Sequence, residues 1–371
     1  MRRISSLLGL GCFLTSLVPA AERWTVQYFY DKDNSTLSFT DLQFPSATHG
    51  VAIGGITENR RRRPVAALTT DGGRTWNLAP LKEPGLTLFL LNEKTGWMTG
   101  LKGKLWKTAD GGRTWNPAAR PRDTKAEPLR VFFLDDSRGW LLCTHKQVYS
   151  TEDGGRTWQP VGVAHQPDVP EQNTLYTAAA FYRQEIGILT GFSRLPGGTS
   201  TLPDWMQPDL IPLGRSPTTS IILISADRGK TWKYSLLRDV GEIARVRVSP
   251  AGKVLMLLRH PESFALPSEI IDFDLKTLRG QPVFGNKNRY VTDIAFAGAT
   301  RAFAVAIDQE NRTPFPAIPG KLKVLQSVEP KQWSEMEVDY RAEARAAVFA
   351  AADGNAWIAT DTGMILKLLS E

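Results

Sequence analysis

Residues 69–76 read TTDGGRTW, and three later segments repeat this octapeptide closely. They are Thr108 to Trp115 (TADGGRTW), Thr151 to Trp158 (TEDGGRTW) and Ser225 to Trp232 (SADRGKTW). The shared pattern is S/T-x-D-x-G-x-T-W, and we call its four copies the boxes. Recurrence of so specific a pattern indicates a chain built from repeated structural units.

The boxes resemble the Asp-box, a motif of sialidases, of the sortilin family and of many other β-propellers. This resemblance implies an all-β propeller and says little about function. The physical chemistry of the residues agrees with a turn between two strands. The Asp accepts hydrogen bonds from the N–H groups of its own turn, the Gly permits a positive φ, and the Trp packs beneath the hairpin.

We therefore interpret the conserved positions of the boxes as structural. Carboxylates spread around a ring cannot converge on one substrate or one calcium ion, so a catalytic role is disfavoured. The structural residues are Asp71, Gly73, Trp76, Asp110, Gly112, Trp115, Asp153, Gly155, Trp158, Asp227, Gly229 and Trp232.

A second repeat gives the number of blades. An apolar strand, a short polar turn and another apolar strand recur after Phe44, Phe89, Phe133, Phe181, Val248, Phe296 and Phe349. Successive anchors are 44 to 67 residues apart, and a four-stranded blade takes about 40–50 residues. The spacing predicts a single domain over residues 21–371 with seven four-stranded blades.

The two ends of the chain are expected to complete one blade together. The last repeat supplies three strands and stops at Leu369 to Glu371, where a box would begin. Residues 23–30 (RWTVQYFY) form an apolar strand, with Trp24 at the place that follows a box. We predict that the strand from Trp24 to Tyr30 pairs with Gly363 to Leu369, which closes the ring and removes its exposed edges.

The first 20 residues have the pattern of a secretory signal. Arg2 and Arg3 precede a largely apolar stretch from Leu7 to Val18, and small residues follow at Pro19-Ala20. Lipidation at Cys12 is the alternative to simple cleavage. We expect an exported protein, periplasmic or extracellular, or in the thylakoid lumen of a phototrophic host. No later apolar run is long enough to predict a membrane span.

Candidate binding residues lie between the second and third strands of several blades. Long connections are expected at 57–64, 193–219, 260–268 and 311–320, and long loops on a rigid scaffold commonly bind partners. Arg60, Arg61, Arg62 and Arg63 are candidates for an anionic anchor, or else form a solvated loop. Trp205 is a candidate apolar contact, or else packs onto the blade beneath, and Phe315 is a second candidate apolar contact.

Signals for catalysis are sparse. The four histidines are scattered, and the sequence contains no HExxH, GxSxG, phosphate-loop or calcium-loop pattern. The Arg-Ile-Pro motif of sialidases is absent, because the only candidate region reads Arg63-Pro64-Val65. We expect a non-enzyme without metal or cofactor. The alternative is a glycan-binding or sialidase-like propeller, with carboxylates and aromatic side chains converging in the central channel.

The leader, the boxes and the Gly-Trp pairs at Gly96-Trp97 and Gly139-Trp140 together resemble the photosystem II stability/assembly factor family. Members of that family are exported seven-bladed propellers that bind a membrane-protein precursor through an arginine-rich patch. The resemblance implies an assembly role with a protein partner, an acidic or membrane-protein segment. A net charge of +7 is too small to predict nucleic-acid binding, and we expect a monomer.

Overall fold

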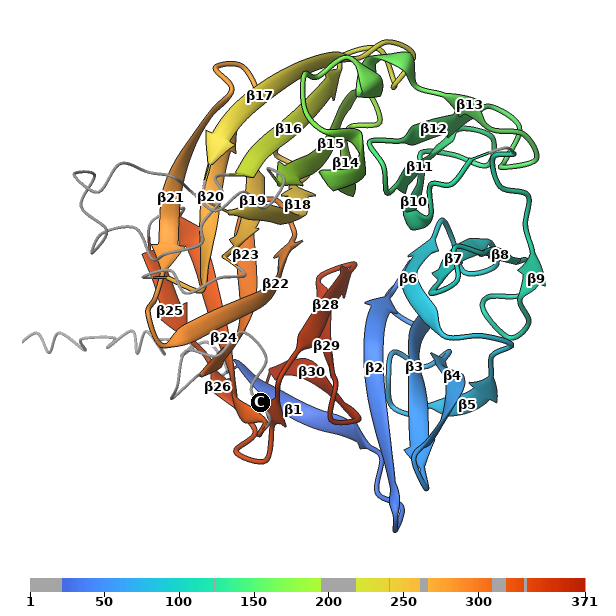
Figure 1. The fold of residues 1–371 in the computed structure, drawn as a ribbon. Coiled ribbons are helices and arrows are strands. Elements are labelled where there is room, and N and C mark those ends of the chain that lie inside the picture. The colour runs from blue at the N-terminus through green and yellow to red at the C-terminus, as the bar shows by residue number, and fades with distance from the viewer. Residues whose placement is uncertain are drawn as a thin grey trace, which may run out of the picture.

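Seven antiparallel sheets stand around a common axis as the blades of a ring (Figure 1). The computed structural model describes residues 22–122, 124–194, 218–239, 241–260, 266–308, 318–329 and 332–370. The four strands of the first six blades follow one another in the chain, the fourth strand of blade seven is the N-terminal strand, and the innermost strand of each blade lies nearest the axis. The predicted seven-bladed, all-β propeller is confirmed.

The strands of blades one to three come first in the chain. They are β2 (Ser35–Gln43), β3 (Gly50–Glu58), β4 (Arg61–Thr69) and β5 (Asn77–Pro80), then β6 (Gly85–Leu90), β7 (Gly96–Gly100), β8 (Leu105–Thr108) and β9 (Asn116–Pro117), then β10 (Pro128–Phe133), β11 (Gly139–Cys143), β12 (Val148–Thr151) and β13 (Gln159–Pro160). Two short 3₁₀ helices, η1 (Gly162–His165) and η2 (Glu171–Asn173), precede blade four.

Blades four to six follow the same order. They are β14 (Thr174–Tyr182), β15 (Ile186–Arg194), β16 (Thr218–Ser225) and β17 (Lys233–Asp239), then β18 (Glu242–Val248), β19 (Val254–Arg259), β20 (Ser268–Asp274) and β21 (Arg279–Gly285), then β22 (Arg289–Ala297), β23 (Arg301–Asp308), β24 (Gly320–Glu329) and β25 (Gln332–Glu335). Blade seven contains β28 (Ala347–Ala352), β29 (Asn355–Thr360), β30 (Met364–Ser370) and β1 (Glu22–Phe29), and the short strands β26 (Glu337–Val338) and β27 (Glu343–Ala344) pair with β1 and β24.

The N-terminal strand closes the ring as predicted. β1 pairs antiparallel with β30, with Trp24 opposite Leu368. Trp24 is fully buried and meets Phe303 and Phe349 edge-on, at ring-centroid distances of 5.9 and 5.5 Å. The other edge of β1 is covered by β26, which pairs with it in parallel. Blade seven is therefore held by segments from both ends of the chain.

The apolar core lies between adjacent blades, and in three of these spaces a Trp stacks on a Phe of the next blade. Trp97 of β7 stacks on Phe133 of blade three at 3.6 Å and 11°. Trp140 of β11 stacks on Phe181 of blade four, and Trp357 of β29 stacks on Phe44 of blade one at 3.6 Å and 3°. In each case the box Trp of the second blade meets the same Phe edge-on: Trp158 on Phe133, Trp232 on Phe181 and Trp76 on Phe44.

One expected loop proves to be regular strand. Residues 57–64 were expected as an inserted connection, but β3 continues to Glu58 and β4 begins at Arg61. Only Asn59 and Arg60 remain in the turn, with φ values of 49° and 61°. Two successive positive φ values are typical of the tight hairpin turns whose twist matches that of the strands, so the pairing continues to the tip.

The other expected connections agree with the strand ends. β15 ends at Arg194 and β16 begins at Thr218, and shorter connections separate β19 from β20 and β23 from β24. Most of 193–219, 260–268 and 311–320 lies outside the described residues.

Removal of residues 22–30 should destabilise the protein and make it associate. The loss of buried Trp24 alone should lower the free energy of unfolding by about 3–5 kcal/mol, and the bared edge of β30 offers unpaired backbone groups to other chains. Thermal unfolding and light scattering after gel filtration measure both effects. Removal of residues 1–21 is the control, and a monomeric truncation with an unchanged melting temperature would contradict the closure.

Candidate functional site

The four consecutive arginines lie at the tip of the β3–β4 hairpin. Arg60 is in the turn, Arg61 to Arg63 begin β4, and all four side chains are exposed. Arg63 Nη2 donates to Glu58 Oε2 at 3.1 Å. Arg60, Arg61 and Arg62 have no ion-pair partner among the described residues. The tip therefore presents three uncompensated guanidinium groups to solvent.

The strand register divides these arginines between two sides of the hairpin. Arg63 pairs with Ile56, whose side chain packs with blade seven, so Arg63 and Arg61 lie on that side. Arg62 lies on the opposite side, toward blade two, and passes over Gly55. A Cβ at Gly55 would lie 2.4 Å from Arg62 Nε, so the glycine makes room for this side chain. A partner can meet cations on either side of the tip.

The β3–β4 hairpin also extends farther from the body of the ring than the β7–β8 hairpin of blade two. β3 and β4 have 9 residues each, whereas β7 and β8 have 5 and 4. The two hairpins begin at equivalent positions, because Gly50 pairs with Thr69 and Gly96 pairs with Thr108, and both threonines are the first residue of a box. About four extra residues per strand raise the arginines by roughly 13 Å. Trp205 and Phe315 lie outside the described residues, so their roles stay predictions.

The box residues serve the fold in the geometry that the structure shows. In the first box, Asp71 Oδ1 accepts Thr75 N at 3.0 Å and Oδ2 accepts the Thr75 hydroxyl at 2.6 Å. The Thr69 hydroxyl donates to Asp71 Oδ1 and accepts the N–H of Gly73, whose φ is 89°. The other three boxes repeat these contacts. Both oxygens of each carboxylate are thus occupied within its own turn.

These hydrogen bonds keep the box carboxylates ionised. The hydroxyl of Thr75 is the main cause that lowers the pKa of Asp71 to about 2, and the Thr231 hydroxyl lowers that of Asp227 to about 2. A carboxyl group with so low a pKa holds no proton to donate at neutral pH. The boxes are therefore unsuited to general acid catalysis.

A second group of charges lines the axis, and the sequence analysis missed it. It consists of Asp41, Arg130, Arg245, Arg247 and Asp293, on the inner strands of blades one, three, five and six. Arg245 and Arg247 both approach Asp293 Oδ1 at 3.2 Å. Burial, followed by the positive charge of the nearby Arg245, lowers the pKa of Arg130 to about 10. We call these five residues the axial cluster.

Its two carboxylates also tie neighbouring blades together. Asp41 accepts Leu42 N at 3.0 Å and Leu88 N of the next blade at 2.8 Å. Asp293 likewise accepts Ile294 N at 2.9 Å and Phe349 N of the next blade at 3.1 Å. Each lies just after a bulge in its inner strand, which aims the side chain at the next blade.

The described residues offer no metal centre. They contain no group of three His, Cys, Asp or Glu side chains placed to hold a metal ion. Cys143 is buried in β11, and burial raises the pKa of its thiol far above the usual range, so it is not a nucleophile.

No protein-family model matches the sequence, and a search of curated proteins finds no relative. Solved structures do resemble it. YCF48 bound to D1 peptide gives a TM-score of 0.58 at 14% identity, covering 94% of this chain and 98% of that one. YCF48 from Cyanidioschyzon merolae gives 0.57 at 14%, covering 93% and 98%. At this identity the likeness shows a shared propeller fold.

Replacement of Asp71 by Ala should destabilise the protein by about 1–3 kcal/mol, the typical cost of leaving buried hydrogen-bonding groups unpaired. Because the folded pKa of Asp71 is about 2, below its unfolded value, its contribution is complete above about pH 5 and disappears as the pH falls toward 2. The difference in the free energy of unfolding between the unaltered protein and Asp71→Ala should therefore become smaller from pH 7 to pH 2, which chemical denaturation of both proteins measures. Glu152→Ala, at an exposed position of the third box, should change nothing; equal effects of the two substitutions would refute the role of Asp71.

Proposed function

We propose that this chain is an exported, non-enzymatic propeller that binds a protein partner and acts as an assembly scaffold. The observation that carries the proposal is the raised β3–β4 hairpin with its uncompensated arginines. The fold shared with a YCF48 structure whose description names a bound D1 peptide supports a protein ligand. The leader sequence supports export, and within the described ranges no helix has the length and apolarity needed to cross a membrane.

The arginine hairpin lies on the face of the ring opposite the boxes. Each box is a turn between third and fourth strands and lies beside a turn between first and second strands, as the bond from Gly72 N to Thr48 O (2.8 Å) shows. The β3–β4 turn is at the other end of the same strands. In blades four, five and six, the connections between the second and third strands also begin and end at this second face, and they are longer than the corresponding turns of blades two and three. We propose this second face as the partner-binding face.

The partner that fits this face is an acidic, extended polypeptide segment. Arginine presents a rigid fork of donors that suits carboxylates, and the basic surface continues from Arg62 toward blade two. There Lys82 and Lys102 are exposed and have no ion-pair partner among the described residues, while Lys104 pairs with Glu83 at 3.3 Å. Leu101, 56% exposed between these lysines, adds an apolar contact.

The glycan-active alternative would require free carboxylates in the channel. Asp41 and Asp293 are the acids that the structure places in the axial cluster, and their oxygens accept backbone N–H groups and guanidinium groups. Such engaged carboxylates support a structural role over a general acid and nucleophile pair. No specific contact of the described residues favours glycan hydrolysis.

Replacement of Arg60, Arg61, Arg62 and Arg63 by Ser should weaken binding of an acidic peptide at least about threefold, since each exposed charge pair contributes about 0.2–1 kcal/mol. The binding that remains should depend less on salt, because screening acts on exposed charges. Fluorescence anisotropy with a labelled Asp/Glu-rich peptide and its Asn/Gln counterpart, at 50 and 300 mM salt, measures both effects. The melting temperature should stay within about 1 °C, as solvated charges contribute little to the fold.

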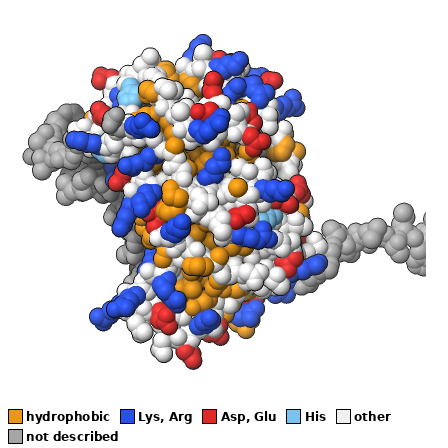
Figure 2. Space-filling view, turned by 90° about the vertical axis from the view of Figure 1, so that its right-hand side faces the viewer, with side chains coloured by type: hydrophobic (Ala, Val, Ile, Leu, Met, Phe, Trp, Pro, Cys, Tyr) orange, Lys and Arg blue, Asp and Glu red, His pale blue; other side chains and the backbone are white. Residues whose placement is uncertain are grey.

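The control must remove equivalent charge elsewhere, because basic side chains are also scattered over the outer flank of the ring (Figure 2). Arg74, Arg113 and Arg156 are exposed on the box face, and their joint replacement by Ser should leave peptide binding unchanged. If this variant loses peptide binding and the hairpin variant keeps it, the box face is the partner-binding face and our assignment is wrong. Equal binding of the acidic and neutral peptides would contradict the charge argument.

A further inference from the structure

A cavity opens at the mouth of the channel on the box face. It has a volume of about 460 Å³ and lies where the inner strands of blades one, five, six and seven end. Its location is opposite the arginine hairpin, so it is separate from the partner-binding face. The volume is within the range of about 300–1,000 Å³ that is usual for small-molecule sites.

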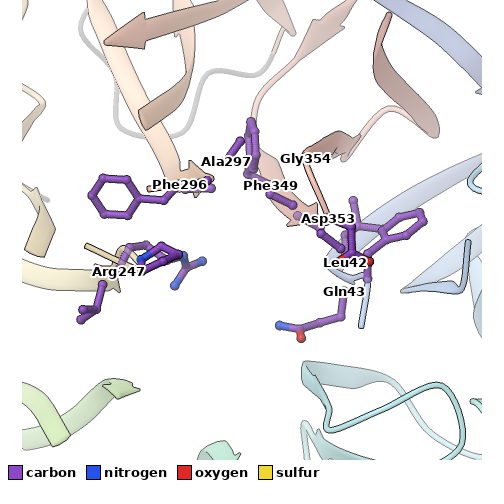
Figure 3. A pocket seen from close by; sticks show the side chains of 16 residues that line it. Leu42, Gln43, Arg247, Phe296, Ala297, Phe349, Asp353 and Gly354 are labelled. Atoms are coloured by element: carbon purple, nitrogen blue, oxygen red, sulfur yellow. The ribbon is translucent and has the colours of Figure 1, made fainter. Parts of the chain in front are cut away.

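Two polar side chains reach into this cavity from opposite sides. Arg247 extends from β18 and Gln43 from β2, with Ala297 and Phe349 on the wall between them (Figure 3). The side chain of Arg247 is 30% exposed. Its guanidinium group donates one hydrogen bond to Val246 O and one to Asp293 Oδ1. A guanidinium group has five N–H donors, so three of them remain for a ligand.

The charges behind the cavity favour an anion. The axial cluster combines three guanidinium groups with two carboxylates, an excess of one positive charge. Asp293 is shared by Arg245 and Arg247, so neither arginine has a carboxylate of its own. Asp353 lies on the rim, where its carboxylate is exposed and accepts Ala47 N at 3.0 Å, so solvent and salt screen its charge from the cavity. An anion at Arg247 would balance the cluster.

Most of the other side chains that line the cavity are apolar. They include those of Leu42, Phe296, Phe349 and a series of alanines in β22 and β28. Such walls bind a hydrocarbon body rather than a second charge, because burying an unpaired polar group is costly. A highly charged ligand such as a polyphosphate would also meet only one available arginine.

We propose that this cavity binds a small organic acid with a single carboxylate and an apolar body. The carboxylate lies on Arg247 in a charge-assisted contact, the amide of Gln43 donates a second hydrogen bond to it, and the apolar body packs against Phe296, Phe349 and the alanines. This site is independent of the partner-binding face.

The test uses 3-phenylpropionate as the probe and 3-phenylpropanamide as its neutral counterpart, titrated calorimetrically into the protein without its leader. The acid should bind at least about 10-fold more tightly than the amide, as expected for a charged hydrogen-bond pair in a partly buried site. Arg247→Gln should abolish that preference, and Gln43→Leu should weaken binding of the acid by about 3- to 10-fold. Arg74→Gln, on the same face, and the Arg60–Arg63 variant should leave it unchanged.

Equal affinity for acid and amide would overturn the proposal, as would the absence of any binding of the acid at 10 mM. Because Arg247 also holds Asp293, Arg247→Gln risks misfolding. Two measurements test the site without that variant. They are the affinities of the unaltered protein for the acid and the amide, and the affinity of Gln43→Leu for the acid. Unchanged affinity for the acid in Gln43→Leu would likewise overturn the proposal, because Gln43 is one of its two polar contacts.

Discussion

The pairing of β1 with β30 is the contact on which the ring depends. Six blades are each made from one continuous stretch of chain, but blade seven lacks a fourth strand until β1 joins it. The same strand brings Trp24 into the space between blades six and seven, where it meets Phe303 and Phe349. A single strand thus supplies both the last sheet edge and the last interblade core, so every other blade interface is held in a closed circle.

The boxes connect this closed circle locally, one blade to the next. Trp357 of blade seven donates its indole N–H to Gly72 O in the box of blade one at 3.0 Å, while stacking on Phe44. Lys367 donates to the same carbonyl oxygen at 3.1 Å and lies over the Trp357 ring. The box is therefore an interblade contact as well as a turn. Blades five, six and seven lack a box, and an apolar cluster that includes Leu255 and Leu325 fills the interface of blades five and six.

The repeats predicted the fold well because their signal is local. Box spacing and apolar anchors are properties of neighbouring residues, and they were sufficient for the blades and the closure. The arginine run was misjudged as a loop because charged residues can form the exposed end of a hairpin, where β-propensity and burial give no signal. The axial cluster was missed because its members meet only in the folded ring. Asp41, Arg130, Arg245 and Asp293 each stand three residues before an anchor, a charged position in an apolar strand that could have drawn attention.

The direction of the closing strand also determines how the molecule responds to force. Glu22 at the start of β1 pairs with Ser370 at the end of β30, so the two ends of the described chain lie next to each other. Tension applied at these ends loads the hydrogen bonds of an antiparallel ladder one pair at a time. Such a ladder unzips at low force, whereas strands pulled from opposite ends shear together and resist. The strand pair that closes the ring in solution is therefore expected to open at low force when the ends are pulled, which single-molecule pulling measures directly.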